Sequence, residues 1–298
     1  MNRFDYISLL IFAILCSCER DVTYSVRDVD DRMVINGIFR AGDAHHEIEI
    51  GRSECLFNHL EDDMGDAHVT VSVNNETIPV SRDERDRTLF SFDCILSEKD
   101  KVIVTADAAG LHTVTGTAVM PEPPCVKDVQ TEWSEGEIDA LVRIKIHIQD
   151  IRDERNYYRI TVKSRSVYKM DGMDTDWRLC EVLYDYDPVF AENRGFESGR
   201  IAHSFGIFSD SIFQGREYTL NVCVRQRRGV DSWTGIEPER YLKVELESLS
   251  QSYYNYLRSI ELSQGTDYFS EPVKIYSNID NGFGILGCYA VTSIVVRI

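Results

Sequence analysis

Five aspartates between residues 171 and 187 lie close enough in the sequence to bind one metal ion together. Asp171, Asp174 and Asp176 fall within six residues, and Tyr184-Asp185-Tyr186-Asp187 adds two carboxylates. Calcium requires six to eight oxygen ligands, which clustered acids in a loop can provide. The order departs from an EF-hand loop, which has an Asx-x-Asx-x-Asx-Gly run and a glutamate at its twelfth position. We therefore interpret the segment as a solvated acidic loop and keep calcium binding as the alternative.

Aromatic side chains accompany these acids. The segment from Tyr168 to Gly206 interrupts the regular succession of predicted strands and carries several aromatic residues. Long loops with aromatic side chains on a rigid β scaffold are common binding sites. We expect a binding surface here, together with the turn from Asn278 to Gly287. The candidate residues of the binding loop are Asp171, Asp174, Asp176, Trp177, Tyr184 and Tyr186.

Motifs that would support catalysis or cofactor binding are weak or missing. Gly282 to Gly287 match the pattern GxGxxG, but a dinucleotide site also needs a helix and a later acid, for which too few residues remain. His45, His46 and Glu47 are residue types that bind transition metals. At most part of the set could reach one ion, because adjacent residues of a strand point to opposite faces. The sequence contains no GxSxG elbow and no CxxC spacing. We expect no catalytic residues, no metal site and no cofactor, calcium being the alternative.

The chain is strongly acidic. It carries 50 acidic and 32 basic side chains, which gives a formal net charge of −18, and it contains no basic block. Contact with phosphates requires a positive surface, so the composition disfavours nucleic-acid binding. The acidity is typical of a solvated surface and would also suit a cationic partner.

Eight cysteines are present, of which Cys16 and Cys18 belong to the N-terminal segment. The other six allow three disulfides in any of fifteen connectivities. Cys223 and Cys288 lie in apolar runs and would equally serve as small buried hydrophobic residues. The sequence leaves both alternatives open.

Alternation of apolar and polar residues dominates the chain and predicts strands. Val69, Val71 and Val73 would face one side of a sheet while the intervening residues face the other. The same period of two runs through residues 142–148. Short strands separated by turn residues at this spacing favour sandwiches or open barrels over βαβ units.

A proline-rich segment divides these strands into two groups. Met120-Pro121-Glu122-Pro123-Pro124 holds three of the seven prolines, and proline cannot donate a hydrogen bond to a β ladder. We therefore predict a mainly β protein with two β-sandwich domains of the immunoglobulin-like or prealbumin-like kind. The predicted domains are residues 33–120 and 126–298, with a linker at 121–125.

One short helix is predicted near the C-terminus, from Gln251 to Leu262. Ser250 can cap it, Gly265 can end it, and apolar residues recur at helical spacing. We expect its tyrosine-rich face to pack on a sheet, and binding of a partner by that face is the alternative.

The first eighteen residues have the composition of an export signal. Arg3 precedes an apolar run from Tyr6 to Leu15, which is too short to span a bilayer as a stable helix. Leu15-Cys16-Ser17-Cys18 resembles the lipobox of bacterial lipoproteins, in which the last cysteine is acylated after cleavage. Several acyl chains, such as palmitate, give lasting membrane anchorage. The expected segments are a signal peptide at residues 1–17, lipidation at Cys18 and a tether at 18–32.

Short motifs follow one another along nearly the whole mature chain. They are Cys18-Glu19, Met33-Val34-Ile35-Asn36-Gly37, Met120 to Pro124, Asn156-Tyr157-Tyr158, Phe208 to Gly215, Ser250 to Leu257, Phe269 to Val273 and Ser277 to Gly287. In these motifs the chain resembles a family of Bacteroidetes lipoproteins known as domain of unknown function 4249. Gln214 departs from the family pattern, which usually has Asn at this position.

The resemblance implies a lipid-anchored, β-rich, two-domain protein of the outer membrane, from genomes where such lipoproteins often accompany TonB-dependent transporters. It implies no catalytic residues, because the family has none assigned. We expect a non-catalytic binding protein that acts beside such a transporter in nutrient uptake, facing either side of the membrane on its flexible tether. The alternatives are a structural or adhesive surface protein and a calcium-dependent binder or hydrolase that uses the acids from Asp171 to Asp187.

Overall fold

A computed structural model of the chain describes most of residues 31–298. The expected signal peptide, Cys18 and the tether up to residue 30 lie outside the described residues. The described ranges are 31–53, 64–134, 139–151, 154–168, 175–184, 186–193, 205–231, 235–264 and 273–298.

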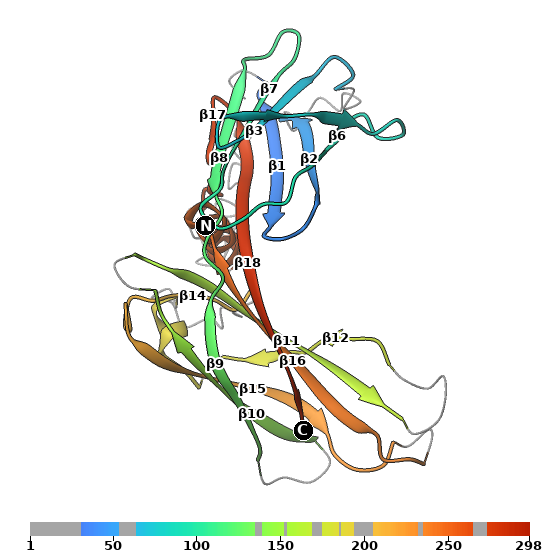
Figure 1. Cartoon of the computed structure of the whole chain (residues 1–298), viewed down its shortest axis with the longest axis vertical. Helices are drawn as coiled ribbons and strands as arrows, with labels where there is room; N and C mark the ends of the chain where they lie inside the picture. The colour runs from blue at the N-terminus through green and yellow to red at the C-terminus, as the bar shows by residue number, and fades with distance from the viewer. Residues whose placement is uncertain are drawn as a thin grey trace, which may run out of the picture. The chain divides into compact units, whose positions relative to one another are not determined.

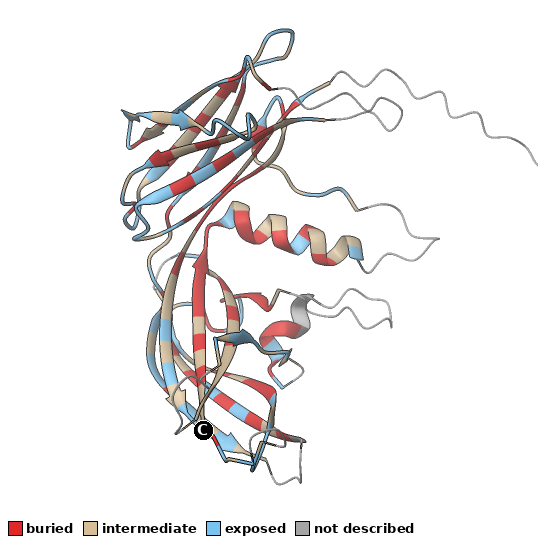
Figure 2. Ribbon diagram, turned by 90° about the vertical axis from the view of Figure 1, so that its right-hand side faces the viewer, coloured by how far each residue is buried: buried red, intermediate tan, exposed pale blue. Residues whose placement is uncertain are grey.

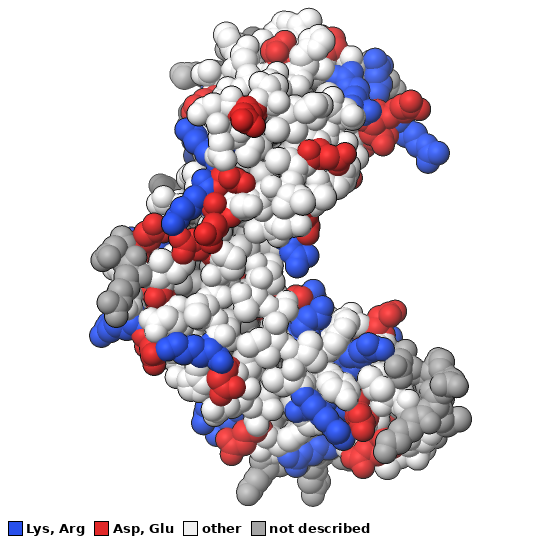
Figure 3. Space-filling model, viewed as in Figure 1, with Lys and Arg blue, Asp and Glu red and all other residues white. Residues whose placement is uncertain are grey.

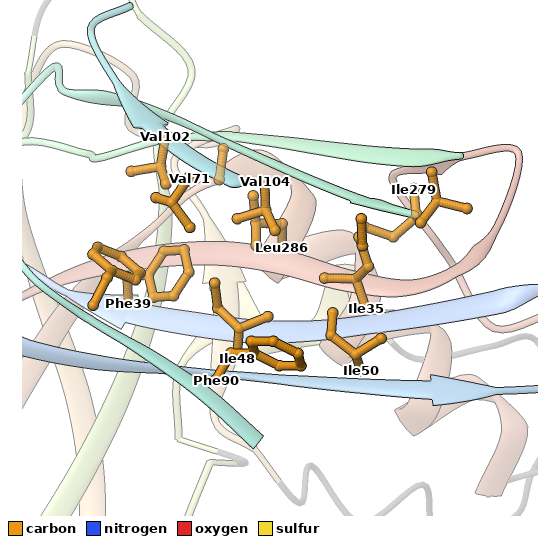
Figure 4. Close-up of a cluster of buried hydrophobic side chains, with 14 of the residues drawn as sticks. Ile35, Phe39, Ile48, Ile50, Val71, Phe90, Val102, Val104, Ile279 and Leu286 are labelled. Atoms are coloured by element: carbon orange, nitrogen blue, oxygen red, sulfur yellow. The ribbon is translucent and has the colours of Figure 1, made fainter. Parts of the chain in front are cut away.

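The first β-sandwich encloses a core of alternating apolar side chains. In β1, Met33, Ile35 and Phe39 are fully buried while Val34, Asn36 and Ile38 are more exposed. Figure 4 shows Ile35 and its neighbours facing the valines of the opposite sheet. One sheet contains β1 (Met33–Arg40), β2 (His45–Arg52), β6 (Leu89–Asp93) and β5 (Val80–Arg82); the other contains β17 (Ile279–Asp280), β8 (Val114–Val119), β7 (Lys101–Asp107), β3 (His68–Val73) and β4 (Glu76–Ile78).

The second β-sandwich has a separate core. Ile144 and Ile146 of β10 pack with Ile160 and Val162 of β11, and all four are fully buried. Figure 2 shows the alternation of buried and exposed positions along these strands. One sheet contains β12 (Arg178–Leu179), β11 (Tyr157–Val167), β16 (Glu239–Leu249) and β18 (Phe283–Arg297), with β14 (Ile207–Ser209) on β11; the other contains β13 (Val182–Leu183), β15 (Glu217–Arg227), β10 (Asp139–Gln149) and β9 (Cys125–Trp133).

Strand β18, red in Figure 1, belongs to both sandwiches. Its first half pairs in parallel with β1, and its second half pairs antiparallel with β16. Gly284 allows the parallel pairing, because its φ is +104° and an added Cβ would lie 2.1 Å from the carbonyl oxygen of Ile35. The first and the last strand of the described residues are therefore neighbours within one nine-stranded sheet.

Helix α2 (Gln251–Gln264) follows β16 directly and packs on the same sheet. Ser250 Oγ accepts hydrogen bonds from the backbone nitrogens of Tyr253 (3.4 Å) and Cys288 (3.0 Å). The serine thus caps the helix and ties it to β18. The 3-10 helix η1 (Pro188–Asn193) contributes Phe190 to the second core.

The described residues confirm a mainly β fold of sandwiches with a C-terminal α-helix that begins at Gln251. It differs from the expected domain ranges at one point, since Ile279, Leu286 and Cys288 pack in the first core and not with the rest of residues 126–298. The pairing of β18 with β1 places these C-terminal residues in the first core. No helix of the described part is long and apolar enough to cross a membrane.

The cysteines that the structure describes form no disulfide. Cys223 and Cys288 are buried, and burial raises the pKa of both thiols. Cys55 lies outside the described residues. The remaining free thiols are Cys94, Cys125 and Cys180.

Candidate functional site

The expected binding loop is only partly described. Asp171 and Asp174 lie outside the described residues. Asp176 is exposed, and Tyr186 is 48 % exposed. Trp177 and Tyr184 are both partly buried but lie against different partners, so these two candidate residues do not share one site.

Trp177 lies directly before β12 and covers Lys243 of β16. The Lys243 ammonium is 5.2 Å from the centroid of a Trp177 ring, within the range of a cation–π contact. Glu245 Oε2 lies 2.7 Å from Lys163 Nζ, and Glu245 Oε1 lies 3.4 Å from Lys243 Nζ. Burial disfavours the charged form of Glu245, but hydrogen bonds and charge from both lysines outweigh this and lower its pKa. Trp177 therefore belongs to a charged strip on the sheet face turned away from the second core.

Tyr184 packs toward the second core. Its ring centroid is 4.7 Å from that of Phe190. Burial raises the pKa of its phenol, and the negative charge of Glu261 adds to the effect. Gly206 lies so close that an added Cβ would be 2.4 Å from the Tyr184 hydroxyl. This tyrosine is a packing residue of the sandwich edge.

Asp187 is a structural carboxylate. Oδ1 accepts hydrogen bonds from the Tyr218 hydroxyl (2.5 Å) and the backbone nitrogen of Val189 (3.1 Å). Oδ2 accepts one from the backbone nitrogen of Asn221 (2.7 Å). Both oxygens thus hold η1 against β15. Among the described residues, no group of three or more His, Cys, Asp or Glu side chains is arranged to hold a metal ion.

Two further acids are buried where the loop after β10 meets the turn after β14. Asp150 accepts hydrogen bonds from the Tyr158 hydroxyl (2.6 Å) and the Gly215 nitrogen (2.7 Å). Asp210 Oδ2 accepts one from the Asn156 nitrogen (2.9 Å), whereas its buried Oδ1 has no hydrogen-bond partner in the described part of the chain. Burial raises the pKa of Asp210, opposed by the Asn156 hydrogen bond and reinforced by the charge of Asp150. These acids fix the two loops in place.

Arg159 and Glu247 form an ion pair beneath α2. Arg159 Nε and Nη2 lie 2.6 and 2.5 Å from Glu247 Oε2, and Nη1 donates to the Tyr253 hydroxyl at 3.0 Å. The two side chains are 19 % and 7 % exposed. Burial raises the pKa of Glu247, and the arginine charge opposes that rise. The pair joins the helix to the sheet through polar contacts.

The turn from Asn278 to Gly287, expected as part of the contact surface, is mainly packed. The Asn278 amide donates to the carbonyl oxygens of Thr117 and Leu286 and accepts from the Leu286 nitrogen, all at 2.9 Å. The side-chain amide thereby extends the ladder between β8 and β18. Asp280 and Asn281 are the exposed residues of the described turn.

A family model described as a domain of unknown function, DUF4249, matches residues 19–294. The chain belongs to the DUF4249 family. The match includes both sandwiches and the helix between β16 and β18. A search of curated proteins found no match.

Solved structures similar to this DUF4249 chain include a DUF4785 family protein from Legionella pneumophila and the adhesin InvE of Yersinia pseudotuberculosis. Sequence identities are 9 % and 11 %, and TM-scores are 0.22 and 0.21. The alignments cover 71 % and 74 % of this chain but 51 % and 55 % of the two solved chains. The chain thus spans about half the length of these structures, and neither likeness bears on its function.

The DUF4249 chain has a pocket of about 570 Å³ at one end of the second sandwich. The pairing of strand ends brings its walls together, since Tyr241 lies opposite Arg297 and the Ile298 nitrogen donates to the Arg240 oxygen at 3.0 Å. No sequence motif marks this pocket, because four separate segments contribute to it. The lining residues are Trp133, Arg228, Gly229, Glu237, Pro238, Glu239, Arg240, Arg297 and Ile298.

Proposed function

We propose that this DUF4249 protein is a non-catalytic binding protein, anchored in the outer membrane by lipid on Cys18, that acts beside a TonB-dependent transporter. The observation that carries the proposal is the motif Leu15-Cys16-Ser17-Cys18 directly after the apolar run from Tyr6. Lipid on a cysteine followed by a charged tether would hold the sandwiches close to a membrane partner while leaving them free to turn.

The proposal fits a surface on which charges of both signs are interspersed, as on the face displayed in Figure 3. Such a face is typical of a solvated protein. Rigid β scaffolds commonly present binding residues on loops and strand ends.

Metabolic labelling tests the anchor. Cells that make the full-length protein would be fed an alkyne analogue of palmitate, and the purified protein would be assayed for incorporated label. We expect label on the wild type and on the Cys16→Ala variant, but none on Cys18→Ala. The Cys16 variant is a matched control, because it removes a thiol two residues away. Equal labelling of both variants would refute acylation of Cys18.

Affinity purification tests the partner. The full-length lipidated protein would be isolated from gently solubilised native membranes and its companions identified by mass spectrometry. A stoichiometric TonB-dependent transporter is the expected result. Recovery of the protein alone from an intact membrane fraction would refute the accessory role and support a free-standing structural or adhesive protein.

A further inference from the structure

The pocket at the end of the second sandwich is more basic than the chain as a whole. Its lining contains three arginines, Arg228, Arg240 and Arg297, against the two acids Glu237 and Glu239. The chain itself has a net charge of −18. Three arginines from three different segments outnumber the two acids, so the side chains of the lining carry a net charge of +1 within an acidic protein.

Two of these arginines have no carboxylate partner among the described residues. Arg240 Nη2 donates to the carbonyl oxygen of Gly229 at 2.8 Å, which holds the guanidinium but leaves its charge unpaired. The Arg228 guanidinium lies 4.5 Å from the centroid of a Trp133 ring. Trp133 thereby positions Arg228 by a cation–π contact without neutralising it.

The third arginine has a different role. Arg297 Nη2 lies 3.2 Å from Glu239 Oε1, and the other oxygen of Glu239 accepts a hydrogen bond from the Tyr241 hydroxyl at 2.9 Å. Both carboxylate oxygens of Glu239 therefore have partners in the wall of the pocket. Its charge offsets that of Arg297, so the exposed Glu237 is the one lining acid that remains against Arg228 and Arg240.

We propose that this pocket binds a small organic oxyanion, a carboxylate or a phosphate, through Arg228 and Arg240. A guanidinium presents paired N–H donors that match either group bidentately. The volume of about 570 Å³ is that of a small-molecule site. Trp133 is a positioning residue, since it orients Arg228. This inference deepens the proposed binding role and rests on it, because a protein that serves a transporter requires a ligand of transportable size.

Calorimetric titration of the purified full-length protein tests the assignment. The probes are inorganic phosphate and glucuronate, a sugar carboxylate, each titrated at low ionic strength. We expect saturable binding of at least one of them, weakened by about tenfold or more in Arg228→Gln and in Arg240→Gln. Binding of phosphate alone would assign a phosphorylated ligand, and binding of glucuronate alone would assign a carboxylate.

Arg225→Gln is the matched control. Arg225 is an exposed arginine of the same strand that leads to Arg228, and it does not line the pocket. Arg228 is itself exposed, so its replacement should preserve the fold, which a thermal melt checks. No saturable heat with either anion, or equal affinity of Arg228→Gln and the wild type, would overturn the proposal. A transporter that still co-purifies with a protein unable to bind anions would leave the accessory role standing and refute only the pocket assignment.

Discussion

Gly287 of β18 lies directly against Tyr253 of α2, so that a Cβ atom added to the glycine would be 2.8 Å from the Cβ of the tyrosine. Real Cβ atoms do not approach so closely. The helix can therefore rest on the strand only because residue 287 lacks a side chain. This contact explains the last glycine of the Gly282 to Gly287 motif by packing, without any nucleotide.

Gly287→Ala should destabilise the protein by about 1–3 kcal/mol, because the added methyl group pushes α2 away from the sheet. Urea unfolding measured by circular dichroism would show the change as a lower midpoint. Stability equal to that of the wild type would mean that the helix does not pack on β18 as described.

Arg159→Met should cost about 3–5 kcal/mol, because Glu247 would remain buried without its partner. The double variant Arg159→Met with Glu247→Leu should recover most of this loss, since apolar side chains then fill the space beneath α2. Unfolding free energies of the two single variants and the double variant complete a mutant cycle. A double variant as unstable as the sum of the single variants would contradict the pairing.

Asp187→Ala should destabilise the protein by roughly 3 kcal/mol, because the Tyr218 hydroxyl and the Asn221 nitrogen would lose their acceptor. Asp176→Ala is the control, since Asp176 is exposed and a surface change of this kind alters stability by only about 0.5 kcal/mol. Thermal unfolding of both variants measures the difference. Equal effects would show that Asp187 does not hold η1.

Local patterns in the sequence predicted the elements that depend on neighbouring residues. Alternation located β3 and β10, and the Ser250 cap located the start of α2. β16 was not predicted, although Leu242, Val244 and Leu246 alternate with charged residues as a strand requires. Its outward face carries charges that pair across the sheet, as Glu245 does with Lys163.

Long-range relationships could not be predicted from the sequence. The parallel pairing of β18 with β1 joins residues about 250 positions apart, and no local signal specifies such a pairing. Trp133 of β9 and Arg240 of β16 both line the pocket because two different sheets pack together there, which no local signal specifies either. The acidic segment differs from its interpretation as a solvated loop at Asp187, which is a buried hydrogen-bond acceptor.

Asp210→Asn should change how stability depends on pH. Burial raises the pKa of Asp210 in the folded protein, with Asp150 adding to the rise and Arg155 opposing it. The folded state therefore binds a proton more tightly than the unfolded state, and wild-type stability falls as pH rises from the unfolded pKa through the raised one. The asparagine does not titrate, so the variant should gain stability relative to the wild type as pH increases. Unfolding measured from acid to neutral pH checks this, and a constant difference would contradict it.

Leu286→Ala tests whether the two sandwiches unfold together. Leu286 is fully buried in the first core but belongs to β18, which continues into the second sandwich. Its truncation should cost about 2–5 kcal/mol. Trp133 packs against the second core and Trp177 covers Lys243 of β16, so the fluorescence of these two tryptophans reports the second sandwich.

We expect the Leu286→Ala variant to lower the midpoint of unfolding equally by tryptophan fluorescence and by circular dichroism, because a shared strand couples the two cores. The tryptophans are distant from the substitution, which makes the test specific, because a defect confined to the first core would not shift the fluorescence transition. Val71→Ala is the control variant and is measured by the same two probes, because Val71 is fully buried but lies on β3, a strand confined to the first sandwich. A fluorescence transition that stays in place while the circular dichroism transition moves would show that the sandwiches unfold independently despite β18.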